Sequence, residues 1–203
     1  MPKNLEPGEP APGLRREALV VAALRVLQQR GYAAVTARKI AAEAQMSLGH
    51  ISYHFADMDE VMSEVYRLAT RLLHETEAQS ERGEGGHPLT ARDRFARFVK
   101  AGFTEEILTP EYLRMRVDLW SAALTRPEIA KTELELYSAS RARLEAILRD
   151  MSHYSRADRV PAVCDLVMAA LDGLWLDWIR RRDRASVNRG LEMVQKLATL
   201  ELS

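Results

Sequence analysis

The chain contains one cysteine, Cys164, and only 6% of its 203 residues are aromatic. A single cysteine excludes an internal disulfide. No apolar run is long and uncharged enough to predict a membrane span or a secretory signal. The formal net charge is zero, which argues against a protein that coats nucleic acid without specificity. These absences favour a globular, cytoplasmic protein with no membrane partner.

Proline is scarce outside residues 1–13, which hold four of the eight prolines. Because proline cannot continue a helix, this stretch is predicted to be a flexible arm. A second breaker-rich stretch, ERGEGGHP at residues 81–88, predicts a linker or turn.

The rest of the chain shows helical periodicity, and no window alternates apolar and polar residues as a strand does. The sequence therefore predicts an all-α fold of about nine helices with short connections. A first helix is expected over 14–30 and a second after Thr36. A third is expected over 48–55 after Ser47, and a long fourth helix from Asp57, with Glu60 three residues later. We expect a three-helix domain over 14–56 and a larger helical domain over 57–203.

The second and third helices have the spacing of a helix-turn-helix, whose second helix enters the DNA major groove. Ile51 and Phe55 are predicted to bury one face of that helix. The other face then presents Gly49, His50, Ser52, Tyr53 and His54. Residues 1–55 carry seven basic and four acidic residues, whereas 56–203 carry 22 basic and 25 acidic residues. The N-terminal part of the chain is therefore the basic part.

The run from Thr36 to Met62 resembles the N-terminal domain of the TetR family of one-component regulators. The matching positions are Thr36, Ile40, Ala41, Ala44, Ser47, Gly49, Tyr53, His54 and Phe55. The resemblance implies that Thr36, Ser47, Tyr53 and His54 contact phosphates, and that Arg38, Leu48, Gly49, His50 and Ser52 lie near base edges. Arg38 is the best candidate for reading a guanine.

Two departures from the family pattern stand out. Gln45 replaces the usual turn glycine, which is acceptable if the turn avoids positive φ. Met58 stands where the family usually has a lysine on a phosphate, so one charge-assisted contact is missing.

A rival interpretation uses His50 and His54, four residues apart on one helix, as ligands of a metal-binding protein or helical enzyme. HISYH lacks the glutamate of a metalloprotease helix and no third ligand is evident. We therefore expect no metal site, no cofactor and no catalytic residues.

Two C-terminal helices carry long apolar faces, which resemble the pair that joins TetR-family subunits into a four-helix dimer interface. The candidate interface residues are Val167, Leu171, Leu174, Trp178, Leu191 and Val194. A homodimer is also what a palindromic operator requires, since its half-sites lie roughly 34 Å apart.

The segments 116–129 and 171–178 are similar to the ligand-binding domain of BetI-type regulators, which implies a small-molecule effector, with choline-like molecules among the candidates. A quaternary ammonium binds to aromatic faces and is also attracted by a carboxylate. The candidates are Phe103, Tyr112, Asp118, Trp120, Tyr137, Asp172 and Trp175. The sequence thus predicts a homodimeric transcriptional repressor that binds double-stranded operator DNA. Its effector is expected to move the fourth helix and thereby release the DNA.

Overall fold

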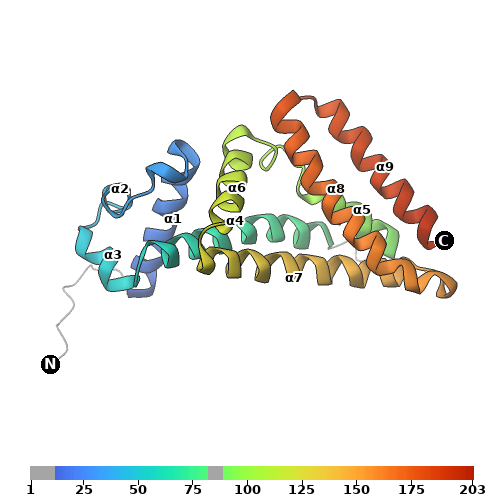
Figure 1. Ribbon diagram of the computed structural model, residues 1–203, viewed down its shortest axis with the longest axis horizontal. Coiled ribbons are helices and arrows are strands. Elements are labelled where there is room, and N and C mark those ends of the chain that lie inside the picture. The colour runs from blue at the N-terminus through green and yellow to red at the C-terminus, as the bar shows by residue number, and fades with distance from the viewer. Residues whose placement is uncertain (1–11, 82–88) are drawn as a thin grey trace.

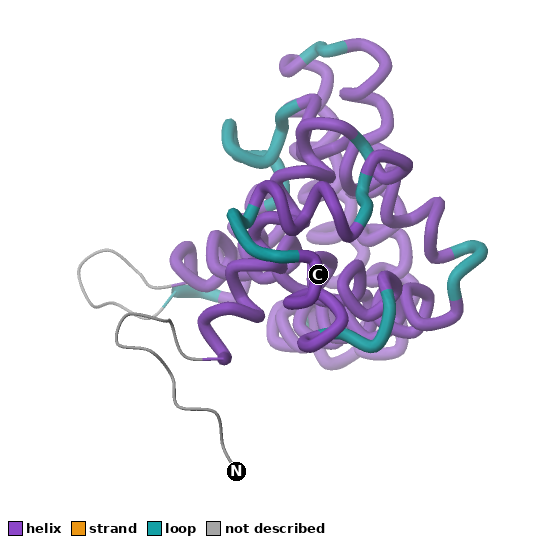
Figure 2. The backbone as a smooth tube through the Cα atoms, turned by 90° about the vertical axis from the view of Figure 1, so that its left-hand side faces the viewer, coloured by secondary structure: helices purple, strands orange, loops and turns teal. Residues whose placement is uncertain are grey.

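The computed structural model describes residues 12–81 and 89–203, and every regular element in these two ranges is a helix (Figures 1 and 2). The elements are α1 (Pro12–Arg30), η1 (Tyr32–Ala34), α2 (Ala37–Glu43), α3 (Leu48–His54), α4 (Met58–Glu81), α5 (Ala91–Ala101), α6 (Pro110–Ala123), α7 (Pro127–Met151), η2 (Tyr154–Arg159), α8 (Val160–Arg181) and α9 (Arg184–Leu202). The all-α prediction is confirmed. Most of the predicted arm and linker lies outside the described residues, but Pro12 and Gly13 belong to α1.

The N-terminal unit is held together by the apolar stripe of α1. Leu19, Ala23 and Leu27 are fully buried, and α1 packs on both α2 and α4. Ile51 and Phe55 are only 6% and 4% exposed, so α3 buries the predicted face and presents the other. α2 begins where expected, because the Thr36 side chain accepts a hydrogen bond from the backbone N–H of Lys39.

The turn between α2 and α3 differs from the expectation for Gln45. Glutamine was expected at this position only in a turn that avoids positive φ, but Gln45 has φ of 55°, in the left-handed region. The N–H of Gln45 bonds to the carbonyl of Ala42 and that of Met46 to the carbonyl of Ala41, which is a Schellman motif with glutamine in the usual glycine position. The hydrogen bonds of the helix end thus hold a glutamine in a conformation that favours glycine.

α4 begins as the capping pattern predicted. The N–H of Glu60 donates to Asp57 Oδ1 over 2.8 Å, and Glu60 Oε2 accepts from the N–H of Ala56 over 2.7 Å. From there α4 runs out of the N-terminal unit along the length of the molecule, with α7 beside it (Figure 1). Hence one continuous helix packs on α1 of the N-terminal unit and on α5 and α7 of the larger unit.

The larger unit places α5 and α7 against α4, with α6 standing between the N-terminal unit and α8 (Figure 1). α8 and α9 pack as a pair at the far end. None of the described helices combines the length and the apolar character needed to cross a membrane.

Candidate functional site

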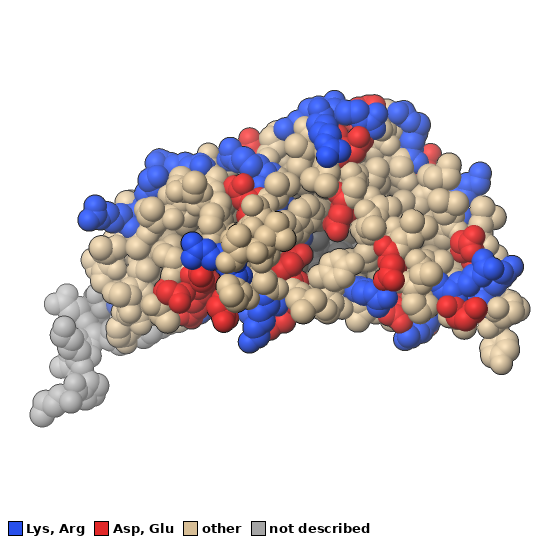
Figure 3. All heavy atoms as spheres, in the orientation of Figure 1, with Lys and Arg blue, Asp and Glu red and all other residues tan. Residues whose placement is uncertain are grey.

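The exposed face of α2 and α3 carries the residues expected to contact DNA. Of the nine candidates, seven are exposed: Thr36, Arg38, Ser47, Leu48, Gly49, Ser52 and Tyr53. His50 and His54 are half-buried. Tyr53 is 77% and Leu48 48% exposed, which is unusual for large side chains that have no surface partner. Lys and Arg side chains gather near this unit along the edge over α1 and α2 (Figure 3).

Several of these side chains are bound to their own helix. Ser47 Oγ lies 2.8 Å from His50 Nδ1, and the Ser52 hydroxyl donates to the carbonyl of Gly49 over 3.2 Å. Ser47 therefore orients His50 and does not cap α3 through its side chain. The Nε2 of His50 remains the ring atom available for an external contact.

His54 lies at the base of this surface, with its ring edge-on to Tyr53 at 4.9 Å between centroids. Burial lowers the pKa of His54, and so do the nearby charges of His50, Arg15 and Arg16. At neutral pH its imidazole is uncharged and can still donate one hydrogen bond.

The rival metal interpretation gains no support from the geometry. Within the two described ranges, no group of three or more His, Cys, Asp or Glu side chains is placed to hold a metal ion. His50 already shares a short contact with Ser47, and His54 packs on Tyr53.

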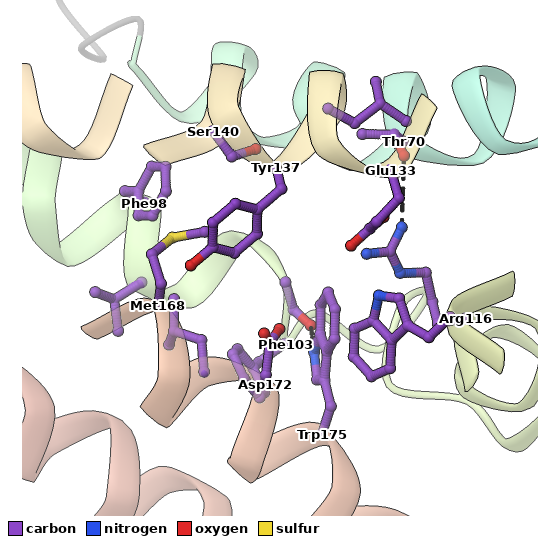
Figure 4. Close-up of a pocket in the computed structure, with 15 residues that line it drawn as sticks. Thr70, Phe98, Phe103, Arg116, Glu133, Tyr137, Ser140, Met168, Asp172 and Trp175 are labelled. Carbon is purple, nitrogen blue, oxygen red and sulfur yellow. Dashed lines mark hydrogen bonds between the residues drawn. The ribbon is translucent and has the colours of Figure 1, made fainter. Parts of the chain in front are cut away.

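A pocket lies in the larger unit among α4, α5, α6, α7 and α8 (Figure 4). It is lined by Thr70, Phe98, Val99, Gly102, Phe103, Arg116, Trp120, Glu133, Leu136, Tyr137, Ser140, Met168, Leu171, Asp172 and Trp175. Its free space is about 80 Å³, well above what one water needs and below the roughly 300–1,000 Å³ of sites for drug-sized ligands. It therefore suits a small ligand. The surface is hollowed between α6, α7 and α8, with acidic side chains at the rim (Figure 3).

The guanidinium of Arg116 occupies the aromatic part of this pocket. Its Cζ lies 5.1 Å from the ring centroid of Tyr66, 5.3 Å from that of Trp120 and 5.5 Å from that of Trp175. The two tryptophan rings stack at 6.1 Å, and Trp175 is fixed because its Nε1 donates to the Gly102 carbonyl over 2.7 Å. The chain thus places its own cation against the aromatic faces that were expected to receive a ligand.

Arg116 is only 9% exposed and is incompletely paired. Its Nη1 donates to Thr70 Oγ1 at 3.5 Å, a long contact, and its buried Nε has no hydrogen-bond partner among the described residues. A buried, unsatisfied donor on a charged group is costly, so a second acceptor in the pocket would be stabilising.

Two carboxylates face the same space. Asp172 projects into it from α8 and Glu133 from α7 (Figure 4). Burial raises the pKa of Asp172 to about 6, with the charge of Glu133 adding to the rise and that of Arg116 opposing it. Glu133 accepts a hydrogen bond from the Tyr66 hydroxyl, and burial raises the pKa of Tyr66 well above its usual 10.

The structure places the seven effector candidates in two groups. Five line the pocket: Phe103, Trp120, Tyr137, Asp172 and Trp175. Tyr112 and Asp118 do not line it. Tyr112 is buried in the core, and Asp118 faces the N-terminal unit, because α6 turns that side away from α7 and α8.

The junction between the two units is built on α6 and its neighbours. Asp118 Oδ2 accepts a 2.9 Å hydrogen bond from the backbone N–H of Tyr32 in η1, and Arg114 donates to the carbonyl of Gln28 at the end of α1. Nearby, Arg126 before α7 pairs with Asp59 at the start of α4 over 3.5 Å. α6 therefore contacts the N-terminal unit on one side and lines the pocket on the other.

A second hollow runs between α8 and α9 on the outer surface, with about 270 Å³ of free space. Its lining is almost wholly apolar: Val163, Leu166, Val167, Ala170, Gly173, Leu174, Gly190, Met193, Val194, Leu197, Ala198 and Glu201. Leu166, Met193 and Leu197 are 54%, 52% and 42% exposed. Contiguous exposed apolar surface of this kind marks an interaction site.

The six interface candidates are distributed differently from the expectation. Val167, Leu174 and Val194 line the hollow, but Leu171 lines the inner pocket and Leu191 is buried within the subunit at 4% exposure. Trp178 is half-buried under Arg182, whose Cζ lies 4.3 Å from its ring. Leu197 belongs to the apolar stripe that the sequence shows for the last helix, whereas the exposed Leu166, Met193 and Leu200 were not among the candidates, because α8 and α9 carry apolar residues on their inner and outer faces alike.

Sequence reasoning also missed Arg116 and Glu133 in the pocket. The one signal that could have found Arg116 is its position four residues before Trp120, which puts both side chains on one helical face.

Two family models match the chain. Residues 19–65 match the bacterial regulatory proteins of the tetR family, and residues 91–202 match the C-terminal domain of BetI-type transcriptional repressors. The HTH-type transcriptional regulator BetI of Stenotrophomonas maltophilia (strain R551-3) is 27% identical over 122 residues, which are 60% of this chain and 58% of that protein. The alignment thus spans little more than half of that relative's length.

Solved structures agree over nearly the whole chain. A transcriptional regulator from Pseudomonas aeruginosa PAO1 superposes with a TM-score of 0.72 at 26% identity, covering 95% of this chain and 93% of that one. A regulator from Saccharomonospora viridis in complex with choline has the same fold, with a TM-score of 0.72 at 18% identity over 91% and 95% of the two chains. The chain therefore belongs to the TetR family of bacterial regulatory proteins and carries a C-terminal domain of the BetI type.

Proposed function

We propose that this protein is a one-component transcriptional repressor that binds a palindromic operator as a homodimer and is released by a small-molecule effector. Residues 14–56 would bind DNA, and 57–203 would hold the effector and form the dimer. The observation that carries the proposal is the position of α6. This helix presents Arg116 and Trp120 to the pocket and Asp118 to the DNA-facing unit.

Within the DNA-binding unit, Arg38 is assigned to a guanine, whose O6 and N7 match a guanidinium fork. Arg38 is exposed on α2, so its side chain can reach a base. Thr36, Ser47, Tyr53 and His54 are assigned to phosphates, and Leu48, Gly49, His50 and Ser52 to the groove floor. Because Met58 replaces a phosphate-binding lysine, operator affinity should depend slightly less on salt than in a lysine-bearing relative.

The dimer is proposed to form through the outer face of α8 and α9. Leu166, Met193 and Leu197 supply exposed apolar area, and Gly173 leaves room for close approach, since nothing lies within 4 Å of a Cβ placed there. Two subunits joined at this end would present their α3 helices to successive major grooves.

The effector is proposed to act through differential binding to two dimer geometries. An effector that shifts α6 would pull on the Asp118 contact with Tyr32 and on the Arg114 contact with Gln28. α4, which packs on helices of both units, would follow. A change in the pocket would thus reach the N-terminal unit by two routes, one through α4, as the sequence predicts, and one through α6.

A small polar effector fits the size and charge of the pocket. The choline seen in a regulator of the same fold supports an organic molecule of that size, although only the fold is shared at that identity.

The proposal is tested by fluorescence anisotropy with duplex DNA from upstream of the gene. Full-length protein should bind with an affinity that falls steeply as salt rises. Arg38→Ala should weaken binding by roughly tenfold or more, as expected for loss of a bidentate base contact. Arg180→Ala, an exposed arginine on α8, serves as the matched control and should bind like the wild type. Salt-independent binding, or equal loss in both variants, would contradict the assignment of α2 and α3.

A further inference from the structure

The pocket contains one buried cation and two carboxylates, and these charges are separated in space. Arg116 and Asp172 lie on either side of the Trp175 ring (Figure 4). Glu133 faces the same cavity from α7 and is held by the Tyr66 hydroxyl. A ligand in this space meets a positive end and a negative end.

A simple organic cation fits this arrangement poorly. The faces of Trp120 and Trp175 that would attract it already lie beside the Arg116 guanidinium, at 5.3 and 5.5 Å. A second cation placed there would be repelled by Arg116 across a low-dielectric interior. A cation would therefore be favoured only near Asp172 and Tyr137.

A simple anion fits no better. Asp172 and Glu133 oppose a negative charge across the cavity, and only Arg116 attracts one. Yet the buried Nε of Arg116 lacks an acceptor, and the Thr70 contact of its Nη1 is long. An oxygen acceptor at this end would satisfy a donor that costs free energy when left unpaired.

We propose that the effector is a small zwitterion, whose carboxylate accepts from Arg116 and whose cationic group lies against Asp172. An amino acid or a betaine has this chemistry and fits a pocket of this size. The inference rests on the proposed function only in taking this pocket as the effector site.

The test uses four probes of nearly equal shape on the purified full-length protein, above neutral pH. Glycine betaine carries both charges and choline the cation with a hydroxyl. Tert-butylacetate, by which we mean the anion of tert-butylacetic acid and not the ester, keeps only the carboxylate. Tert-butylethanol, the corresponding alcohol, has no charge. Calorimetry and thermal shift should rank glycine betaine first, roughly tenfold or more tighter than the other probes. Over choline it gains a charge-assisted hydrogen bond from Arg116 to its carboxylate, and over tert-butylacetate it gains the attraction between its cationic group and Asp172. Tert-butylethanol should bind most weakly.

Two variants assign the ends of the ligand. Arg116→Lys keeps the charge but loses the Nε donor, and should remove most of the advantage of glycine betaine over choline. Asp172→Asn should weaken both cationic probes and leave tert-butylacetate bound at least as well. Arg180→Lys, at an exposed arginine on α8, and Asp177→Asn, at a half-buried carboxylate on the same helix that pairs with Arg181, are the matched controls.

Choline binding as tightly as glycine betaine in the wild type, with no effect of Arg116→Lys, would overturn the proposal in favour of a simple cation. Tert-butylacetate binding as tightly as glycine betaine would overturn it in favour of an anion. If no betaine or amino acid of a broader series binds, the zwitterion assignment fails. These readouts need no DNA, so failure here is distinct from failure of the repressor proposal, which anisotropy measures alone.

Discussion

The carboxylate of Asp118 accepts a 2.9 Å hydrogen bond from the backbone N–H of Tyr32, and this bond joins the middle of α6 to η1 of the N-terminal unit. Two residues earlier on the same helix, Arg116 lines the pocket. A shift of α6 caused by a ligand must therefore strain or break a contact with η1.

Replacing Asp118 by alanine is expected to uncouple the two units. The Tyr32 N–H would lose its partner, at a cost of about 1–2 kcal/mol of unfolding free energy in urea. Effector affinity without DNA should change little, but the ratio of operator affinities with and without effector should move towards one. Asp118→Asn keeps an acceptor oxygen and should retain most of the ratio. An unaltered ratio in the alanine variant would show that α6 does not transmit effector binding through the Asp118 contact.

Asp172→Asn is expected to stabilise the protein without ligand at neutral pH. The folded pKa of Asp172 is about 6 against an ordinary 3.8, so the folded state binds more protons than the unfolded state between these values. Stability from this group is therefore present at low pH and lost as pH rises from about 4 to 6. The shift corresponds to a cost on the order of 2–3 kcal/mol at pH 7.

Urea unfolding at several pH values checks this prediction. The Asn variant should be more stable than the wild type at pH 7 and lose the advantage near pH 4. Asp177→Asn is the control, because its carboxylate pairs with Arg181, which lowers its pKa. A destabilised Asp172→Asn protein at neutral pH would mean that Asp172 is satisfied within the fold.

Gln45→Gly is expected to raise the free energy of unfolding by up to about 1 kcal/mol. Gln45 has φ of 55°, which costs a non-glycine residue about 1–2 kcal/mol, offset in part by the greater freedom of glycine in the unfolded chain. Ala139→Gly, at an exposed position in the middle of α7, should have the opposite sign, because glycine disfavours a helix interior. Denaturant curves of the two variants make the comparison. A loss of stability in Gln45→Gly would show that contacts of the glutamine side chain stabilise the fold by more than the positive φ destabilises it.

Met193→Arg is expected to convert the proposed α8–α9 dimer to monomers. Met193 is 52% exposed in the α8–α9 hollow, and a guanidinium there would be buried without a partner in a dimer. Sedimentation velocity at several protein concentrations measures the change. Leu134→Arg, at a 65% exposed leucine on α7, is the control and should leave the association state unaltered. If Met193→Arg still dimerises, the subunits meet elsewhere.

The helices were predictable because their caps and apolar stripes are local. Thr36 caps α2 and Asp57 opens α4 as their spacing indicated, and Ile51 and Phe55 are buried as the 3.6-residue period required. These features depend only on neighbours within a few residues.

The pocket and the outer face were harder to predict, because they depend on how each helix is rotated against the others. Arg114, Arg116 and Asp118 are all charged residues of one helix, and the sequence does not tell which of them faces a cavity. Of the three, only Arg116 lines the pocket. α8 is apolar around much of its circumference, so its pattern did not separate Leu171, which lines the inner pocket, from the exposed Leu166. The φ of Gln45 was missed because the hydrogen bonds of the helix end, and not the residue type, set that conformation.

The arrangement of the pocket also bears on how such a regulator acquires new ligands. Arg116 and Trp120 lie on α6, which contacts the N-terminal unit, so we expect substitutions there to alter both the choice of ligand and the response of that unit. Tyr137, Ser140 and Met168 line the same cavity from α7 and α8, away from that junction. Libraries for engineering a biosensor are therefore best built at these three positions, where a change of ligand leaves the output machinery in place.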